Sequence, residues 1–252
     1  MILEALNYAA TWKVTTPPHR PFIRSSIDLW SRARRCKAQW AEHEENTRRA
    51  ILAAASAASP RRTAVILGSG LLRDVPIRPL AAAFDTVVLI DLVHVASVRA
   101  WLAAQGLKNI RLIERDLSGY DLLQAGRPVE PLDFLRRVPY LDFVASANLL
   151  SQIGRGVKRR MKLQPDAAMP EDAVSRLIHA HVEGLAQLPA KTCLVTDTSF
   201  DLIDRNGVLR ESTDLMAGVK LPPQKAEWRW PVAPPGEESR DYRIEHHVGA
   251  WF

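Results

Sequence analysis

The chain has 252 residues, of which 47% are hydrophobic, so it is long enough to bury a sizeable core and is not a largely disordered chain. It carries 34 basic and 28 acidic residues, and this modest excess is compatible with an anionic substrate but is shared by many soluble enzymes. Cys36 and Cys193 have no metal-type or redox-type spacing, and no apolar run reaches membrane-spanning length, so we expect a cytoplasmic protein with free thiols.

Residues 1–60 are expected to form an N-terminal arm and a helical cap, ahead of one domain over residues 61–252. Three prolines between residues 17 and 21 argue against regular helix, since proline lacks an N–H donor and fixes φ, so residues 1–24 are predicted to be an extended arm or loop. A long helix, either continuous or with one break, is predicted from Ile27 to about Ser59. It either packs on the domain or covers a ligand cleft.

A glycine turn between two apolar strands is the most informative stretch. Thr63 to Leu67 is short, apolar and rich in β-branched residues, as is typical of a buried strand, and Gly68-Ser69-Gly70 follows it at once. A second apolar strand, Thr86 to Ile90, ends on Asp91. The glycines allow backbone N–H groups to approach a ligand, and the acid can accept hydrogen bonds from both hydroxyls of a ribose. The pattern predicts a nucleotide-binding half-unit.

These residues resemble the class I S-adenosylmethionine-dependent methyltransferases over roughly residues 60–200. A third predicted strand, Asn109-Ile-Arg-Leu-Ile-Glu-Arg-Asp116, adds an acid where that family places one near the adenine amino group. The resemblance implies a Rossmann-like fold and S-adenosylmethionine as the cofactor. The residues that it places at the cofactor are Gly68, Ser69, Gly70, Asp91, Asp116, Leu117, Ala147 and Asn148.

Two departures from the family pattern lie in the glycine turn. Leu72 stands where the third glycine is usual, and no acid precedes Gly68. Because of these departures, an alternative function is that of a binding protein with a methyltransferase fold that has lost catalytic turnover. A nicotinamide-dependent oxidoreductase shares the first half-unit, but the incomplete glycine fingerprint and the terminal hairpin argue against it.

Residues after the fourth and fifth predicted strands are the candidates for substrate binding and catalysis. The fourth strand, Leu141 to Ala147, precedes Asn148, and ligands of open parallel sheets lie beyond the carboxyl ends of such strands. The Asn/Asp-Pro-Pro-aromatic motif of base-methylating members is missing here. The basic segment 154–162 is predicted to be a loop, and we expect the substrate to contact Gln152, Arg155 and Arg159. The catalytic candidates are Gln152, as an orienting group, and Asp197.

The remaining histidines favour structural roles over metal binding. His181 lies on the apolar side of a predicted helix and is expected to be a hydrogen-bonded core residue. His246 and His247 are adjacent in a predicted strand and cannot face the same way, so one is expected to be packed and the other exposed. We therefore expect no metal site.

The tail completes the predicted fold. Alternating residues at 227–232 and 242–248, joined by a Pro/Gly turn, predict an antiparallel hairpin, whereas residues 201–225 are expected to be a loop-rich insertion. The fold class is thus α/β: a Rossmann-like, doubly wound sheet of about seven strands, mostly parallel with a C-terminal antiparallel hairpin, plus an N-terminal helical cap. The expected function is methyl transfer to a small acceptor, with an anionic acceptor favoured and a nucleic acid disfavoured.

Overall fold

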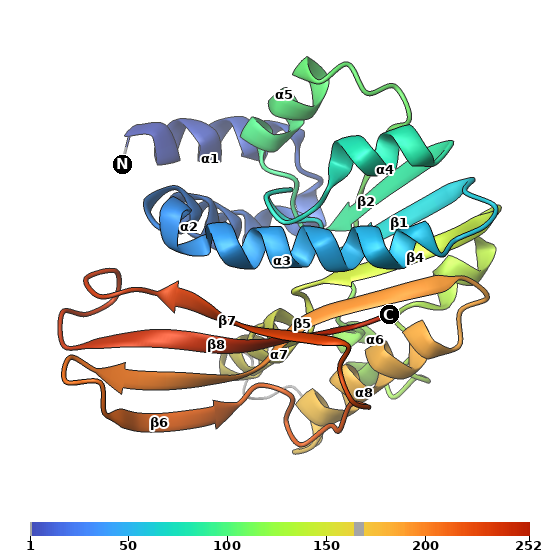
Figure 1. The fold of residues 1–252 in the computed structure, drawn as a ribbon. Helices are drawn as coiled ribbons and strands as arrows, with labels where there is room; N and C mark the ends of the chain where they lie inside the picture. The colour runs from blue at the N-terminus through green and yellow to red at the C-terminus, as the bar shows by residue number, and fades with distance from the viewer. Residues whose placement is uncertain (1, 164–168) are drawn as a thin grey trace.

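The computed structural model describes residues 2–163 and 169–252, in which a mixed sheet lies between two layers of helices (Figure 1). Its strands are β1 Thr63–Leu67, β2 Thr86–Asp91, β3 Ile110–Glu114, β4 Leu141–Ala147, β5 Lys191–Asp204, β6 Leu209–Asp214, β7 Ala226–Ala233 and β8 Tyr242–Trp251. The order across the sheet is β3-β2-β1-β4-β5-β8-β7, and β6 pairs with β5 off this path. Strands β1 to β5 are parallel, and β6, β7 and β8 pair antiparallel. The predicted fold class is confirmed, with one more strand than expected.

The central strands β1 and β4 of the sheet are buried on both faces by helices. The helices are α1 Ile2–Val14, α2 Ile23–Arg35, α3 Lys37–Ser56, α4 Ile77–Ala83, α5 Ala96–Ala104, α6 Tyr120–Gln124, α7 Leu150–Leu163 and α8 Ala173–Ala186, with 3-10 turns at Pro17–Phe22 and Asp133–Arg137. Successive residues of β1 face opposite layers: Ala64 and Ile66 join the core under α3, α4 and α5, whereas Val65 and Leu67 join the core under α6, α7 and α8. Full burial on both faces explains the unbroken apolar run of β1.

The N-terminal prediction is wrong over residues 2–14, which form helix α1. This helix turns polar side chains inward: Asn7 donates to Ser97 Oγ over 3.0 Å, and Thr11 Oγ1 accepts from the Ala96 amide over 2.9 Å. Apolar residues such as Leu6 face outward instead. The predicted long helix is interrupted at Cys36, which separates α2 from α3.

Two other segments predicted as loops are regular structure. The basic segment 154–162 belongs to α7, whose inward residues, such as Ile153 and Val157, recur at helical spacing. In the predicted insertion 201–225, β5 runs on to Asp204 and pairs with β6. The alternation there is weak because β6 is largely exposed on both faces. The predicted C-terminal hairpin is confirmed as β7 and β8.

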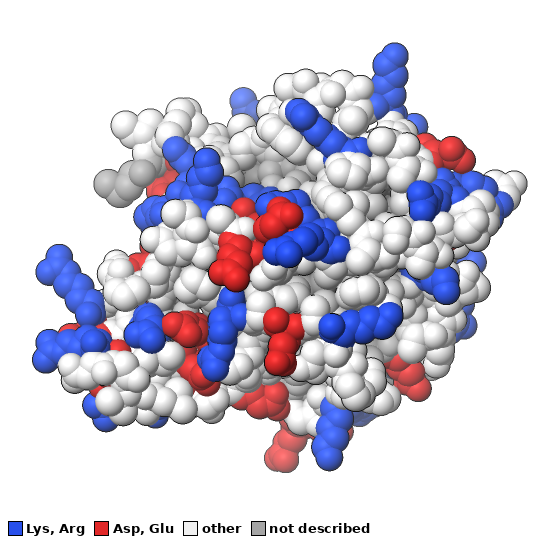
Figure 2. Space-filling model, in the orientation of Figure 1, with Lys and Arg blue, Asp and Glu red and all other residues white. Residues whose placement is uncertain are grey.

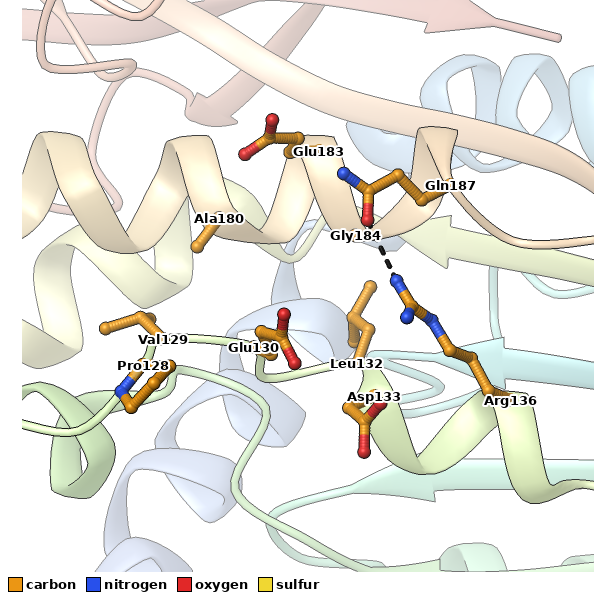
Figure 3. Close-up of a pocket in the computed structure, with 10 residues that line it drawn as sticks. All are labelled: Pro128, Val129, Glu130, Leu132, Asp133, Arg136, Ala180, Glu183, Gly184 and Gln187. Atoms are coloured by element: carbon orange, nitrogen blue, oxygen red, sulfur yellow. Dashed lines mark hydrogen bonds between the residues drawn. The ribbon is translucent and has the colours of Figure 1, made fainter.

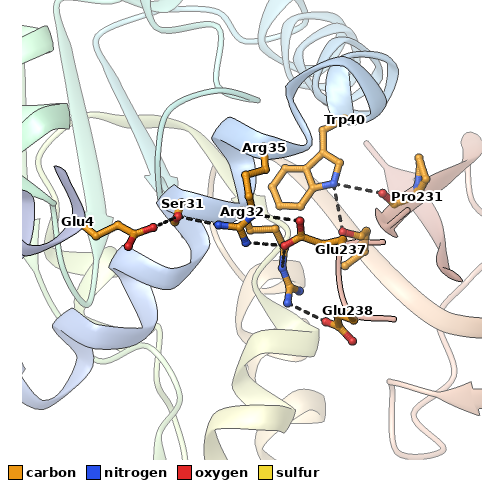
Figure 4. Close-up of polar contacts among 9 residues, drawn as sticks. Glu4, Ser31, Arg32, Arg35, Trp40, Pro231, Glu237 and Glu238 are labelled. Carbon is orange, nitrogen blue, oxygen red and sulfur yellow. Dashed lines mark hydrogen bonds and ion pairs between the residues drawn. The ribbon is translucent and has the colours of Figure 1, made fainter. Parts of the chain in front are cut away.

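Ion pairs fasten the N-terminal helices to the turn between β7 and β8 (Figure 4). Arg35 contacts Glu237 over 2.5 Å, and Arg32 contacts Glu238 over 2.7 Å. Glu4 of α1 in turn accepts from Ser31. Because the Glu237 side chain is only 7% exposed, its negative charge is costly to bury, and the two arginines offset that cost. The hydrogen bond from Arg35 is the main cause that lowers the pKa of Glu237 from its ordinary value of 4.5.

Replacing Glu237 with glutamine should therefore lower the free energy of unfolding by about 1 kcal/mol near neutral pH, a value kept small because Arg35 is half exposed. A lowered folded pKa gives stabilisation that is complete above the ordinary value and is lost as the pH falls through the folded value. Urea unfolding at neutral and acidic pH checks this: the difference between wild type and variant should shrink on acidification. Glu238→Gln is the matched control, because the Glu238 side chain is 32% exposed and its effect should be smaller. A difference that grows in acid contradicts the assignment.

Candidate functional site

The candidate site lies where the strand order reverses, at the carboxyl ends of β1, β4 and β5. From β1 the chain moves outward through β2 to β3 and then crosses back to β4, on the other side of β1. Crossovers that leave β1 and β4 in opposite directions open a crevice between their ends, where ligands of such sheets bind. The residues that follow β1, β2, β4 and β5 therefore define the site.

The glycine turn after β1 is held against the end of β2. Gly68 donates to the Ile90 carbonyl over 2.9 Å, and the Gly70 amide donates to Asp91 Oδ2 over 2.6 Å. Both glycines have positive φ, +72° at Gly68 and +49° at Gly70. A Cβ on Gly68 would lie 2.9 Å from the Ala147 carbonyl oxygen, so contact with the end of β4 excludes any side chain there. A Cβ on Gly70 has room, and only its φ is restrictive.

Leu72 occupies the position of the family's third glycine and keeps a glycine-like backbone, with φ of +58°. Its side chain is 6% exposed and joins the core under α3. The departure seen in the sequence therefore leaves the path of the turn intact.

Leu72→Gly should show whether the strain of the positive φ or the packing of the Leu72 side chain contributes more to stability. Relief of the left-handed strain is worth about 1 kcal/mol, whereas removing a buried leucine side chain costs about 2–5 kcal/mol. We expect a net loss of stability of about 1–4 kcal/mol, measured by urea unfolding. A variant more stable than wild type would show that the Leu72 side chain adds little to the core.

Asp91 is fixed by the backbone around it. Besides the Gly70 amide, its Oδ1 accepts from the Leu92 amide over 2.7 Å. Burial raises the pKa of Asp91, while His94 and these amides act against that rise. Burial likewise lowers the pKa of His94, which contacts the Ile113 carbonyl over 3.2 Å. Each carboxylate oxygen has a second lone pair, so Asp91 is able to accept hydroxyl groups as well.

Asp116, after β3, is paired with a residue of α7. Its Oδ1 accepts from the Ser118 amide over 2.8 Å, and its Oδ2 contacts Arg160 over 2.5 Å. Burial opposes its charge, but Ser118 and Arg160 outweigh that and lower the pKa of Asp116. The guanidinium of Arg160 also lies 4.9 Å from the ring centre of Tyr120. Leu117 is buried in the core under α6, α7 and α8.

Asn148 follows β4 directly and adopts a positive φ of +50°. The backbone of Ala147 is the part of β4 that meets the glycine turn. The Asn148 amide nitrogen donates to Asp74 Oδ2 over 2.7 Å and lies 3.3 Å from His43 Nε2. Burial raises the pKa of Asp74, and the hydrogen bond from Asn148 acts in the opposite direction. Asn148 thus joins the loop after β1 to helix α3.

His43 stands between Asn148 and the C-terminal hairpin. Trp228 donates its indole N–H to His43 Nδ1 over 3.0 Å, and the ring of Trp230 stacks on the imidazole with centres 4.0 Å apart. Burial lowers the pKa of His43 to about 3, although Asp197 acts in the opposite direction. His43 is therefore neutral at physiological pH, and its Nδ1 accepts from Trp228.

Asp197 is buried against His246 of β8, with 2.5 Å between Asp197 Oδ2 and His246 Nδ1. Burial disfavours its charge, but the hydrogen bond and charge of His246, followed by Arg155 and Ser151, lower the pKa of Asp197. Phe200 stacks on the His246 ring. The pair lies in the middle of β5, just beyond its pairing with β4, on the sheet face covered by α3.

Several buried polar atoms around this crevice have no hydrogen-bond partner among the residues that the structure describes. Buried polar atoms are normally paired with protein, water or ligand, so these atoms are able to form further hydrogen bonds with water or with a ligand in the crevice. These atoms are Ser69 Oγ, Asn148 Oδ1, Ser151 Oγ, Asp197 Oδ1 and Trp230 Nε1.

The substrate candidates on α7 lie on its exposed side. Gln152 donates back to the Asn148 carbonyl over 2.7 Å, which places it beside the crevice. Arg155 and Arg159 are exposed, and Arg155 is close enough to Asp197 to affect its pKa. The structure therefore brings Gln152, Arg155 and Asp197 together at one end of the sheet.

The other histidines are accounted for by packing and ion pairs. His181 is fully buried and contacts Ser146 Oγ over 3.0 Å, so its predicted core role is confirmed. His247 faces the opposite side of β8 from His246 and pairs with Asp201 over 2.7 Å, as the alternation predicted. Within residues 2–163 and 169–252, no group of three or more His, Cys, Asp or Glu side chains is arranged to hold a metal ion.

A separate pocket of about 220 Å³ lies between α8 and the segment before β4 (Figure 3). Its walls include Leu132 and Gly184, and Arg136 donates to Gln187 across it over 2.8 Å. Both segments lead into the amino ends of β4 and β5, at the opposite edge of the sheet from the glycine turn. It is not part of the candidate site.

Sequence reasoning missed several residues of the site, among them His43, Asp74, Trp228 and Trp230. The alternation of residues 227–232 does place both tryptophans on one face of a strand, which was the available signal. His43 and Asp74 carry no local pattern, because only the packing of α3 and of the loop after β1 brings them to Asn148.

Comparisons with known proteins give similar folds at low identity. No family model matches the chain, and no curated protein matches it. Among solved structures, a DhpI complex is 15% identical, covering 90% of this chain and 97% of its own, with a TM-score of 0.41. The N-methyltransferase NodS from Bradyrhizobium japonicum is 14% identical over 85% and 90%, with a TM-score of 0.41.

A third solved structure, 1,6-didemethyltoxoflavin-N1-methyltransferase from Burkholderia thailandensis, is 14% identical over 93% of this chain and 91% of its own, with a TM-score of 0.42. Likenesses of this size assign no activity or ligand to the chain. The strand order and the antiparallel ending of its own sheet give this chain a Rossmann-like, doubly wound fold.

Proposed function

We propose that the chain binds S-adenosylmethionine at the glycine turn and transfers its methyl group to a small acceptor. The observation that carries the proposal is the turn itself: two glycines with positive φ, one of them pressed against β4, and the Gly70 amide held 2.6 Å from Asp91 at the end of the neighbouring strand. This arrangement places a glycine turn and a carboxylate together at one crevice, as a nucleoside ligand requires.

The residues present suit this cofactor. The turn of Gly68, Ser69 and Gly70 would hold its amino-acid part, and the unpaired hydroxyl of Ser69 offers one further contact. Asp91 would accept the ribose hydroxyls. The adenine would lie toward Asp116 and Leu117 beyond β3. When bound, the cofactor supplies the electrophilic methyl group, and the protein's part is to align the acceptor and to exclude water.

Ala147 and Asn148 would complete the cofactor site from β4. The Ala147 carbonyl oxygen meets Gly68, and the Asn148 side chain leaves Oδ1 unpaired beside the crevice. Arg160 would fix Asp116 in place through their ion pair. The departure at Leu72 does not count against binding, since the backbone there still follows the glycine conformation.

Isothermal titration with S-adenosylhomocysteine and with NAD tests the proposal. We expect the first to bind and the second to bind weakly or not at all, because the turn lacks the third glycine of the dinucleotide fingerprint. Binding of NAD alone would replace the proposal with an oxidoreductase. Binding of S-adenosylhomocysteine without methyl transfer to any component of a cell extract would favour a non-catalytic binding protein of the same fold.

A small-molecule acceptor is supported by the cover over the crevice. Helix α3 packs on β4, β5 and β7, and enclosure of this kind favours small acceptors. On the face that carries α3, basic and acidic side chains are interspersed, so this face is not the uniformly basic surface that a phosphate backbone prefers (Figure 2). Arg155 and Arg159 beside the crevice suit an acceptor with an anionic part. In the described part of the chain, no helix is long and apolar enough to cross a membrane.

Mobility shifts with RNA and DNA at near-physiological salt test this choice of acceptor. We expect no tight binding. Tight binding, with a steep salt dependence that flattens when Arg155 and Arg159 are changed to alanine, would replace the small acceptor with a nucleic acid.

A further inference from the structure

We propose that the Asp197–His246 pair contacts the reacting group of the acceptor, and that His246 Nε2 accepts its proton during methyl transfer. The acceptor is therefore a nitrogen or oxygen nucleophile that carries a proton at neutral pH. This inference rests on the proposed function, and it assigns a catalytic role to His246 within the same site.

The first support is the position of the pair. Asp197 lies two residues beyond the part of β5 that pairs with β4, which ends at Val195, and the backbone amide of Asn148 donates to the Val195 carbonyl over 2.8 Å. His43 lies between the end of β4 and the Asp197–His246 pair. It is 3.3 Å from Asn148, and it is close enough to Asp197 and His246 for both residues to affect its pKa. The pair therefore adjoins the residues that border the glycine turn.

The second support is the chemistry of the acceptor atoms at this place. Asn148 Oδ1 is buried and has no partner among the described residues, and the Asp197 carboxylate, which is 1% exposed, is contacted by His246 and lies beside Ser151. The amide oxygen and the carboxylate accept hydrogen bonds and donate none. A ligand group that contacts them must donate, which a protonated nucleophile does and an unprotonated anion does not.

The third support is the state of His246. Its Nδ1 contacts Asp197, so only Nε2 is able to bind a ligand. No described residue forms a hydrogen bond with His246 Nε2. The rings of Phe200 and Trp230 flank the imidazole and fix its plane. The charged or titratable groups that face the pair are His43 from α3 and Arg155 from α7. An aspartate that fixes one nitrogen and stabilises the imidazolium is the arrangement of a general base.

The step balances as follows in atoms and electrons. The acceptor's lone pair forms a bond to the methyl carbon, and the bond from that carbon to sulfur breaks with its electron pair returning to sulfur. The acceptor's proton passes to His246 Nε2, and the imidazolium formed is stabilised by Asp197 until the proton leaves to water. The products are the methylated acceptor and S-adenosylhomocysteine.

Sinefungin tests this without knowledge of the acceptor. It is an analogue of S-adenosylhomocysteine that places a primary amine where the transferable methyl group would lie, so its ammonium group should meet the pair. Titration calorimetry should show that Asp197→Asn and His246→Gln lower the ratio of sinefungin to S-adenosylhomocysteine affinity by at least about fivefold, while the S-adenosylhomocysteine affinity itself is unchanged. His247→Gln is the matched control, since its side chain pairs with Asp201 on the other side of β8.

Wild-type protein provides a second measurement if the variants do not fold. In a crystal structure with sinefungin, the amine of the ligand should lie within hydrogen-bond distance of Asp197 or of His246 Nε2. An unchanged ratio in folded variants, or a bound amine that contacts neither side chain, overturns the role of the pair while S-adenosylhomocysteine binding leaves the proposed function standing. Failure of the wild type to bind either compound removes the proposed function and this inference together.

Discussion

Gly70→Val should reduce the affinity for S-adenosylhomocysteine by at least about 100-fold, or about 2.7 kcal/mol, while the domain stays folded. A Cβ at Gly70 meets no atom closer than 3.8 Å, so the substitution does not clash with the fold. Its cost is a β-branched residue at φ of +49°, together with methyl groups in the space that the ligand needs. Titration calorimetry measures the affinity, and thermal unfolding shows whether the domain persists.

Gly106→Val is the matched control for this substitution. Gly106 has a similar φ of +67°, no atom lies within 4 Å of its ideal Cβ, and it follows α5 at the other end of the sheet. We expect it to lower stability by a similar amount and to leave binding unchanged. Normal binding by Gly70→Val would mean that the turn does not cradle the cofactor.

Asp91→Ala should weaken S-adenosylhomocysteine binding by about 1–3 kcal/mol, the usual cost of losing charge-assisted hydrogen bonds. It should also lower the free energy of unfolding, because the amides of Gly70 and Leu92 lose their acceptor. The affinity must therefore be measured at a temperature at which the variant is folded. Asp85→Ala is the control, since Asp85 is exposed at the amino end of the same strand and should leave binding unaltered. Equal affinity of folded Asp91→Ala and wild type would remove Asp91 from the ribose site.

The sequence predicted the central sheet and the turn because their signals are local. An apolar strand that is buried on both faces, two glycines directly after it and an acid at the end of the next strand lie within residues 63–91. Each of these features has one physical explanation in a parallel sheet. The C-terminal hairpin was also predicted from local signals, because polar and apolar residues alternate along its strands and a Pro/Gly turn separates them.

The parts that the sequence did not predict depend on tertiary contacts. Helix α1 buries Asn7 and Thr11 against the start of α5 and exposes Leu6, so its pattern is the reverse of an ordinary amphipathic helix. The acids of the site were visible, but their partners were not. Asp116 meets Arg160 and Asp197 meets His246 only after the sheet has formed, across 44 and 49 residues of sequence.

A crystal structure of the protein with S-adenosylhomocysteine tests the central claim most directly. We predict the ligand in the crevice between the ends of β1 and β4, with its amino-acid part against Gly68 to Gly70. Both ribose hydroxyls should lie within hydrogen-bond distance of Asp91, and the adenine should lie near Asp116. A ligand bound elsewhere, such as in the pocket beside α8, or crystals that show no ligand at saturating concentration, would contradict the assignment of the glycine turn as the cofactor site.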